Sequence, residues 1–422
     1  MAFKRLHKKG KRAEASGDFI AALDIGTEVV KVLIAKVVGE ELEIVGVGRK
    51  QQMIGDMHSG AIADINSVVK NCEVALAEAE EQAGLQAKRV IVGIAGELVK
   101  GTTATIRYRR PQPNKPLDES EMEFIIEKVQ ERAQEKAQRQ VAMETGNGDV
   151  EVKLVNAALV GIHIDGYKVS NPIGFQGKDV AVQIYTAYAP MVHIGAIERV
   201  CDELALDLLA VAAEPFAVSR SVIGNDVSSN FTAILVDVGG GTTDIAVIDD
   251  GGVEGTRMFG IGGRSFTRQI ANAMNLSYEE AEKVKLALDD KELEKSKREV
   301  AEEAVDRTLQ VWLSGVVLAL EEFTGVDHLP GKILLCGGGS SLGSIQEILG
   351  DSDWYKELPF THRPKVQLIE KDDVAGITDK VDAGLDHTFI TAMGLLRVGF
   401  DTMSGMSGDE SIMEKVSRAL RS

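Results

Sequence analysis

The stretch AILVDVGGGTTDIAVID, from Ala233 to Asp249, decides the predicted fold. Two apolar runs flank three glycines and two threonines, which is typical of two strands joined by a tight turn. Glycine lets the backbone bring consecutive N–H groups against an anion, and threonine hydroxyls add donors. A carboxylate such as Asp237 repels phosphate but can hold Mg²⁺ through water, and the metal then bridges to phosphate oxygens. The stretch therefore predicts a hairpin that binds a polyphosphate together with its metal.

The start of the chain repeats this pattern in a shorter form. The motif DIGT (Asp24–Thr27) follows the apolar run Phe19–Leu23 and precedes the β-rich run Val29–Val38. A single Asp-x-Gly-Thr motif is usually an ordinary turn, whereas the longer motif around Asp237 is much more specific. Two such hairpins that face each other would hold a polyphosphate from both sides. We therefore expect an α/β fold with two duplicated lobes and one shared cleft.

A third glycine-rich loop lies in LLCGGGSSLGSI (Leu334–Ile345). It follows a predicted strand, Lys332–Leu335, and precedes a predicted helix, Leu342–Leu349. Backbone N–H groups at a helix N-terminus suit an adenosine and its α-phosphate, although a plain strand-to-helix turn has the same composition. The chain has no GxxxxGK[ST] and no strict GxGxxG, which excludes a P-loop and the simplest dinucleotide-binding motif.

The composition limits the classes of function. The chain has 422 residues, a formal net charge of −18 and 44% hydrophobic residues, which is typical of a globular protein. The negative charge argues against non-specific nucleic-acid binding. Three widely spaced cysteines indicate neither a zinc site nor a disulfide framework and suit a reducing cytosol. A run of about 20 apolar residues, which a membrane-spanning helix needs, is not present, and the N-terminus does not resemble a secretory signal.

The pattern of the chain also predicts an insert in the first lobe. A charged helix over Asp118–Gln140 and strands over Val152–Ile164, Tyr167–Val169 and Val180–Tyr188 indicate an α+β subdomain. The basic N-terminal tail, residues 1–18, is either solvated or a contact for an anionic surface. The expected units are a disordered basic tail (1–18), a first lobe (19–100 and 189–228), the insert (101–188), a second lobe (229–261 and 331–400), its small helical subdomain (262–330), a linker (401–410) and a terminal helix (411–422).

These motifs resemble the actin/Hsp70/sugar-kinase superfamily, whose two lobes are duplicated ribonuclease H-like units. Within it the chain is most similar to the bacterial cell-division family FtsA, over about residues 19–400. The place of the insert, the segment NPIGFQGKDVAVQIYTAYAP within it, the motif GIAG at Gly93–Gly96 and the late segment FITAMGLLR carry this resemblance.

The resemblance implies a site for ATP and Mg²⁺. Asp24 and Asp237 match the positions that hold the metal, through water, and Lys31 matches a lysine that reaches phosphate. Glu214 matches a glutamate that positions the attacking water, so Glu214 and Asp237 are the expected catalytic residues. The implied cofactor-binding residues are Asp24, Gly26, Thr27, Lys31, Gly239, Gly240, Gly241, Thr242, Thr243, Glu282, Lys285, Gly337, Gly338, Gly339 and Ser340.

The terminal segment SIMEKVSRALRS (411–422) predicts a short basic amphipathic helix. Such a helix on a flexible linker suits an interfacial membrane anchor, and the resemblance to FtsA implies a membrane-targeting tail. Without Trp or Phe its binding should be weak unless a polymer adds avidity. A frayed terminal helix or a helix docked on the body is the alternative. The residues expected to bind the membrane are Ile412, Met413, Val416 and Leu420 on the apolar face, with Lys415 and Arg418 away from it.

The resemblance implies an ATP-binding cell-division protein that tethers FtsZ filaments to the inner face of the cytoplasmic membrane at the division site. The implied partners are the C-terminal peptide of FtsZ, further copies of the chain in filaments and other divisome proteins on the insert. ATP hydrolysis is expected to be slow or absent. The alternatives are an actin-like cytoplasmic adaptor of type IV pilus assembly and a small-molecule kinase, although no substrate pocket is indicated for the latter.

Overall fold

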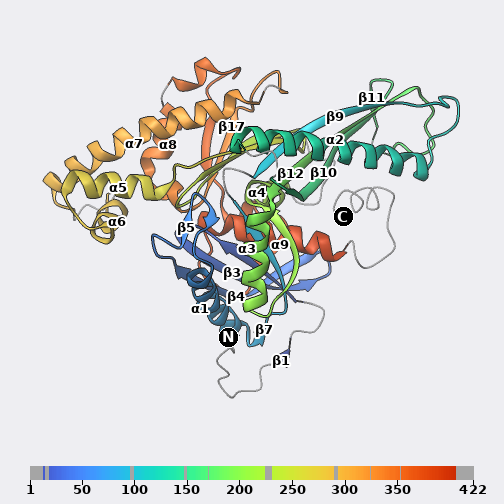
Figure 1. The fold of residues 1–422 in the computed structure, drawn as a ribbon. Helices are drawn as coiled ribbons and strands as arrows, with labels where there is room; N and C mark the ends of the chain where they lie inside the picture. Colours follow the sequence, from blue (N-terminus) through green and yellow to red (C-terminus); the bar gives the residue numbers. More distant parts are fainter. Residues whose placement is uncertain are drawn as a thin grey trace.

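Two mixed β-sheets form the cores of two lobes, and an elongated insert extends to one side of them (Figure 1). The predicted terminal helix (411–422) and the predicted linker from residue 405 onward lie outside the described residues, and Asp401–Ser404 belong to the last helix. Within the predicted disordered tail, Ala13–Glu14 instead form strand β1, which pairs in parallel with β7 (Leu85–Gln86). The computed structural model describes residues 13–14, 19–95, 99–146, 150–169, 171–223, 231–288, 293–323, 325–351 and 353–404.

The first lobe contains a six-stranded sheet in the order β13-β8-β2-β3-β4-β19. β2, β3 and β4 form an antiparallel meander, and β8, β13 and β19 join it in parallel. The predicted first hairpin is therefore β2–β3, in the middle of this sheet. The strands are β2 (Phe19–Ile25), β3 (Val29–Val38), β4 (Glu41–Gln51), β8 (Arg89–Ile94), β13 (Asp207–Ala213) and β19 (Ile377–Asp379), with a small hairpin of β5 (Met57–His58) and β6 (Ala61–Ile62) beside them.

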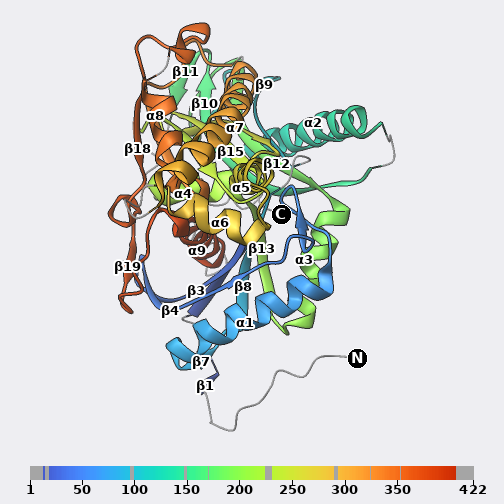
Figure 2. The ribbon, with the colours of Figure 1, turned by 90° about the vertical axis from the view of Figure 1, so that its left-hand side faces the viewer.

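Helices cover both faces of the first sheet (Figure 2). α1 (Ile65–Ala83) packs on β3 and β4 with α3 (Met191–Glu203) beside it, while α4 (Glu214–Ile223) and α9 (Ile390–Ser404) pack together on the opposite face. A Cβ atom at Gly48 of β4 would overlap the carbonyl oxygen of Ala75, so glycine is what lets α1 approach the sheet closely. α9 lies in the range predicted for the second lobe, but its apolar side packs on β2 and β8 of the first.

The second lobe is built around the second hairpin. β14 (Ala233–Val238) and β15 (Thr243–Asp249) are antiparallel, β16 (Gly252–Phe259) continues the meander, and β17 (Lys332–Cys336) and β18 (Lys365–Leu368) join in parallel. Four helices complete the lobe, and α7 buries Trp312 in its core. These helices are α5 (Gly263–Met274), α6 (Tyr278–Leu286), α7 (Lys295–Glu321) and α8 (Gly343–Asp351).

The strands of the insert continue the sheet of the second lobe, although the insert interrupts the first lobe in sequence. β9 pairs with β16 at Gly255↔Thr102 and Thr256↔Gly101, which makes one nine-stranded sheet. The insert also contacts the first lobe, because the side chain of Asn156 accepts a hydrogen bond of 2.7 Å from the backbone of Ala213. Its elements are β9 (Lys100–Arg109), α2 (Glu119–Thr145), β10 (Val152–Ile164), β11 (Tyr167–Val169) and β12 (Asp179–Pro190).

Within the described parts of the chain, no helix is long and apolar enough to cross a lipid bilayer. The three cysteines are buried and carry free thiols.

Candidate nucleotide site

One cavity of about 630 Å³ lies between the two lobes and brings the glycine-rich segments together. Both Asp24 of the first hairpin and Asp237 of the second line it. Glu214, the first residue of α4, reaches the same cavity. Most of the site residues predicted from the sequence line this cavity, and they are Asp24, Gly26, Thr27, Lys31, Glu214, Asp237, Gly239, Gly240, Thr242, Glu282, Lys285, Gly337, Gly338 and Gly339.

The tips of the two hairpins touch each other. A Cβ atom at Gly240 would come within 2.6 Å of Cβ of Glu28, and one at Gly241 would come within 2.8 Å of the side chain of Thr27. The glycines of the second hairpin therefore allow a close approach that any side chain would prevent. This contact brings the two predicted phosphate-binding turns next to each other.

Lys31 is held beside Asp24 on the floor of the cavity. The two residues are paired directly across β2 and β3, and Lys31 Nζ lies 3.1 Å from Asp24 Oδ2. Burial lowers the pKa of Lys31, but Asp24, Asp237 and Glu214 outweigh that effect, so its pKa lies above the usual value. Lys31 is therefore charged at neutral pH and faces the region where phosphate would lie.

The carboxylates of the second hairpin are only partly satisfied. Asp237 Oδ2 accepts a hydrogen bond of 2.5 Å from the hydroxyl of Thr391 at the start of α9. Asp244 Oδ2 accepts one of 3.2 Å from Thr242, while its Oδ1 is buried without a partner among the described residues. A buried carboxylate oxygen without a donor is costly and indicates a missing cation or donor.

Burial and mutual repulsion raise the pKa of the acid groups Glu214, Asp237 and Asp244 in this cavity. Burial raises the pKa of Glu214 well above its usual range, and Asp24 and Asp244 raise it further. Burial and then Asp237 raise the pKa of Asp244 in the same way. Burial also raises the pKa of Asp237, although Thr391 and Lys31 offset part of that rise. A bound divalent cation would reverse this balance, because it favours the ionised carboxylates.

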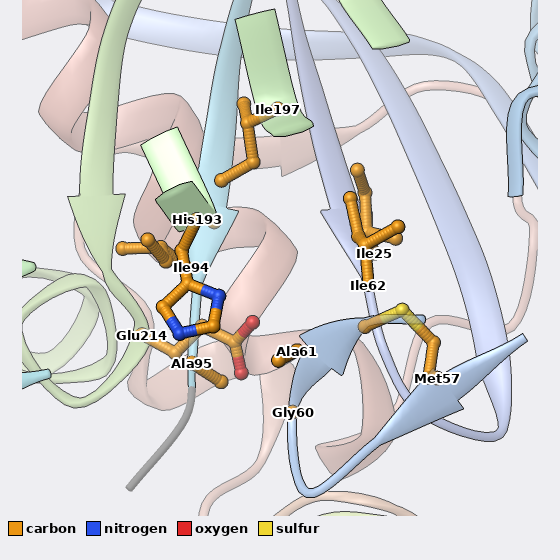
Figure 3. A pocket seen from close by; sticks show the side chains of 11 residues that line it. Ile25, Met57, Gly60, Ala61, Ile62, Ile94, Ala95, His193, Ile197 and Glu214 are labelled. Carbon is orange, nitrogen blue, oxygen red and sulfur yellow. The ribbon is translucent and has the colours of Figure 1, made fainter. Parts of the chain in front are cut away.

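A second, small cavity of about 20 Å³ lies behind Glu214 (Figure 3). Its size corresponds to about one water molecule. Glu214 lines both cavities, and in the small one its carboxylate shares the wall with the imidazole of His193. Burial lowers the pKa of His193, so the imidazole is neutral at neutral pH.

The residues present fit a magnesium–polyphosphate better than a directly chelated metal. Among the described residues, no three His, Cys, Asp or Glu side chains are grouped so that they could hold a metal ion. Paired glycine turns, one charged lysine and a partnerless buried carboxylate oxygen suit a cation that is bound through water and phosphate. Asp24 and Asp237 are the residues that would hold it.

Comparisons with known proteins identify the family to which this site is similar. A family model described as Cell division protein FtsA matches residues 234–394, from the second hairpin into α9. Cell division protein FtsA of Pseudomonas aeruginosa is 26% identical over 418 residues, which cover 93% of this chain and 92% of that protein. Its counterpart in Bacillus subtilis is 24% identical over 357 residues, which cover 80% of this chain and 77% of that protein.

The chain is similar to FtsA over most of its length. The resemblance inferred from the motifs is thus confirmed.

Solved structures confirm the actin-like fold class of this FtsA relative. The PilM-PilN type IV pilus biogenesis complex contains a chain that matches with a TM-score of 0.65 at 17% identity, over 92% of this chain and 99% of that one. MreB 5 of Spiroplasma citri bound to AMPPNP matches with a TM-score of 0.50 at 12% identity, over 92% of this chain and 98% of that one.

Three residues named from the motifs do not line the cavity of this FtsA relative. Gly241 faces Thr27 of the other hairpin. Thr243 is buried, donates to the carbonyl of Ile261 and accepts from the indole of Trp312. Ser340 is buried and donates to the carbonyl of Cys336. Their role is to shape the loops, since a motif match does not distinguish residues that hold a loop from residues that face its ligand. The predicted membrane-binding residues 412–420 lie outside the described residues.

One wall of the cavity, next to the second hairpin, is formed by α5 and α6. Lys285 Nζ lies 2.8 Å from Glu282 Oε2, and both residues contact the hydroxyl of Thr267. Tyr278 lines the same wall, and its buried hydroxyl has no partner among the described residues. Burial raises the pKa of Tyr278 to about 12, so the hydroxyl remains a donor at neutral pH. This polar wall suits the adenosine part of a nucleotide.

Sequence reasoning missed several residues of the site in this FtsA relative. Arg264 of α5 binds Glu28 of the first hairpin with an N–O distance of 2.5 Å, and thereby joins the lobes. Thr391 supports Asp237, and Arg49 lines the cavity from β4. The signal for Thr391 was the segment FITAMGLLR, which we used only as a family motif. Nothing in the local pattern places Arg264 or Arg49 at the cleft, because only the tertiary fold brings them there.

Proposed function

We propose that this FtsA relative binds Mg-ATP in the cleft and acts as an actin-like protein of bacterial cell division. The observation that supports the proposal most is that Asp24 and Asp237 line one cavity together with the glycines of both hairpins. Nucleotide binding also agrees with the actin-like fold that the chain shares with MreB 5, whose structure was determined with AMPPNP. The role in cell division rests on the FtsA relatives and their long coverage of this chain.

The residues of the cleft divide the work of binding. Gly26, Gly239 and Gly240 line the part of the cavity where phosphate would lie, and Lys31 adds a positive charge. Magnesium, when bound, neutralises phosphate charge and acts as a Lewis acid. Glu214 would orient a water toward the bound phosphates and, in its carboxylate form, would accept a proton from that water. The burial of these acids in the ligand-free state favours binding over rapid turnover.

Binding can be tested on the full chain by titration calorimetry with Mg-AMPPNP. Asp237→Asn should weaken the affinity at least about 10-fold, because loss of one charged contact costs about 1.5 kcal/mol or more. Asp306→Asn on α7, an exposed carboxylate outside the cavity, is the matched control and should leave the affinity unchanged. Equal affinities for both variants would remove the nucleotide site from the proposal.

The finer role follows the FtsA relatives. The protein tethers FtsZ filaments to the inner face of the cytoplasmic membrane by binding the C-terminal peptide of FtsZ. It self-associates into filaments, contacts other divisome proteins through the insert and inserts residues 411–422 into the lipid interface. Flotation with liposomes rich in anionic lipid tests the anchor, since deletion of residues 411–422 should abolish co-flotation. Pull-down with the FtsZ peptide tests the partner, and a scrambled peptide is the control.

An adaptor of type IV pilus assembly is the second candidate. The match to the PilM-PilN complex favours it, with a TM-score of 0.65 over 92% of this chain. Such an adaptor would capture a short peptide of a membrane partner and would not need residues 411–422. Flotation that is unchanged by the deletion, together with no capture of the FtsZ peptide, would favour the adaptor. A small-molecule kinase would instead show rapid phosphoryl transfer to a sugar or polyol.

A further inference from the structure

A row of charged residues crosses three strands of the first lobe and ends at Arg49. Asp24 on β2 pairs with Lys31 on β3, and Lys31 pairs with Arg49 on β4. Residues directly opposite each other in antiparallel strands place their side chains on the same face of the sheet. Asp24, Lys31 and Arg49 therefore face the cleft together, and all three line its cavity.

The neighbour of Arg49 serves as an internal reference. Successive residues of a strand point to opposite faces, so Lys50 shares its face with Gly46 and Gly48, over which α1 packs. Lys50 also lines the cavity, but it lies opposite Val30, whose side chain is buried in the core. Of these two adjacent cations, only Arg49 continues the row of Asp24 and Lys31.

The other cations of the cavity that face the cleft have acidic partners. Lys31 pairs with Asp24, Arg264 with Glu28, and Lys285 with Glu282. Arg49 is exposed and has no carboxylate within ion-pair distance among the described residues. Two cations directly opposite each other, here Lys31 and Arg49, repel in the absence of an anion. An anion between them removes that repulsion.

We propose that Arg49 binds the terminal phosphate of the nucleotide and makes the cleft prefer the triphosphate to the diphosphate. This inference rests on the proposed nucleotide site and adds a determinant of its specificity. The wall for adenosine is in the second lobe, at Tyr278, Glu282 and Lys285. The phosphate furthest from the base therefore points toward the first hairpin and the Lys31–Arg49 row. The planar guanidinium donates to two phosphate oxygens at once.

The test compares ATP and ADP binding to the full chain, with Mg²⁺ present, for three proteins. Arg49→Gln should weaken ATP binding about 5- to 20-fold and change ADP binding less than about 2-fold, since a charge-assisted contact is worth about 1 to 2 kcal/mol at a partly exposed site. Lys50→Gln removes the same charge from the adjacent residue, which lines the cavity but lies outside the row of Asp24 and Lys31. It should change ATP and ADP binding to the same extent, and by less than Arg49→Gln changes ATP binding. Circular dichroism melting checks that both variants fold.

The outcomes separate this inference from the proposed function. If the unchanged chain binds neither nucleotide, the proposed nucleotide site itself is wrong. If it binds both and Arg49→Gln lowers the two affinities equally, or not at all, the site stands and the role of Arg49 is refuted. Equal losses in Arg49→Gln and Lys50→Gln would indicate general electrostatics and would also refute it. A further titration uses ADP together with inorganic phosphate. Tight binding of inorganic phosphate that depends on Arg49 would show that Arg49 holds a released product instead of the terminal phosphate of ATP.

Discussion

The acid groups of the cleft are held together by the fold against their own repulsion. Glu214 comes from a helix start, Asp24 and Asp237 from two hairpins, and Asp244 from the strand after the second turn. Burial raises the pKa of Glu214 and of Asp244 well above the usual range, so both carboxyls keep a proton to higher pH than exposed carboxyls do. Such a cluster of carboxyl groups lowers the stability of the folded chain, and a bound cation would restore that stability.

Glu214→Gln should therefore stabilise the ligand-free chain in a pH-dependent way. A carboxyl whose folded pKa is raised contributes its full stability below the unfolded value of about 4.3 and loses it as pH rises through the folded value. The glutamine variant cannot ionise, so its advantage should be absent near pH 4 and reach about 1 kcal/mol at pH 7. Denaturant unfolding at pH 4.5, 6 and 7.5 measures it.

Glu279→Gln is the matched control for this experiment, because Glu279 is exposed on α6. Its free energy of unfolding should follow the parent protein at every pH. An advantage of Glu214→Gln that is the same at all three pH values would contradict the titration and indicate better packing alone. Added Mg-nucleotide should narrow the difference between Glu214→Gln and the parent protein.

At this scale the sequence predicts residue types better than their tasks. The motifs name Asp24, Asp237 and Glu214, and all three line the cavity. They do not separate Thr242, which faces the cavity, from Thr243, which is tied to Trp312. Neighbouring residues of a motif share one local pattern, and only the packing around them decides which side chain faces the ligand.

The two hairpins act as a pair because their turns are in contact. Both turns line the cavity, and the separation of the turns would fix how a polyphosphate is held between them. Gly240 lies where a side chain would meet Cβ of Glu28 at 2.6 Å. The three glycines of the second hairpin therefore have different roles, since Gly240 and Gly241 set the spacing whereas Gly239 and Gly240 line the cavity.

Gly240→Ala should push the hairpins apart and weaken Mg-AMPPNP binding about 10-fold or more, because a small misplacement of binding groups has large effects. Gly350→Ala in α8 is the matched control, since a Cβ atom there meets no neighbour within 4 Å. Calorimetric titration of both variants gives the comparison. If Gly240→Ala binds as well as Gly350→Ala, the contact between the turns does not set the geometry of binding.

At the scale of elements, the sequence predicts those with strong local patterns. The strands Val29–Val38, Val152–Ile164 and Tyr167–Val169 appear with the predicted bounds. Strands β9, β13 and β16 were missed. β9 alternates polar residues with few apolar ones, β13 follows a helix after a short turn, and β16 begins with glycine and glutamate. Their pairing with neighbouring strands stabilises them more than their own composition does.

The two lobes are joined across the cleft by a pair of opposite charges. Arg264 of α5 is buried, donates to Glu28 of the first hairpin and also reaches the carbonyl oxygens of Met53 and Ile54. Its backbone N–H donates to the carbonyl of Gly240 in the second hairpin. One residue thus contacts both phosphate turns and the loop after β4, so the closed arrangement of the lobes depends on it.

A double-mutant cycle with Arg264→Gln and Glu28→Gln should show a coupling energy of about 1 to 3 kcal/mol in the unfolding free energy. Each single variant should also bind Mg-AMPPNP more weakly, because it favours an open cleft. Arg307 and Glu303, an exposed pair on α7, provide the control cycle and should couple by less than about 0.5 kcal/mol. Additive effects at Arg264 and Glu28 would show that the pair does not hold the lobes together.

At the scale of the molecule, the sequence predicts the duplicated lobes but not how the insert and the last helix are placed. α9 follows the second lobe in sequence, yet its apolar face matches the first sheet. The insert leaves the first lobe in sequence, yet its strands extend the second sheet. Long-range pairing of this kind leaves little trace in a local pattern, so it appears only in the structure.

The root of the insert is bonded to β16 of the second lobe and, through Asn156, to β13 of the first, so it connects the two lobes. Because the insert is bonded to both lobes, a rotation of one lobe relative to the other should also move the insert. A rotation of a few degrees between the lobes should therefore displace the distal end of the insert. A partner bound at that end would then respond to the occupancy of the cleft without contacting the nucleotide.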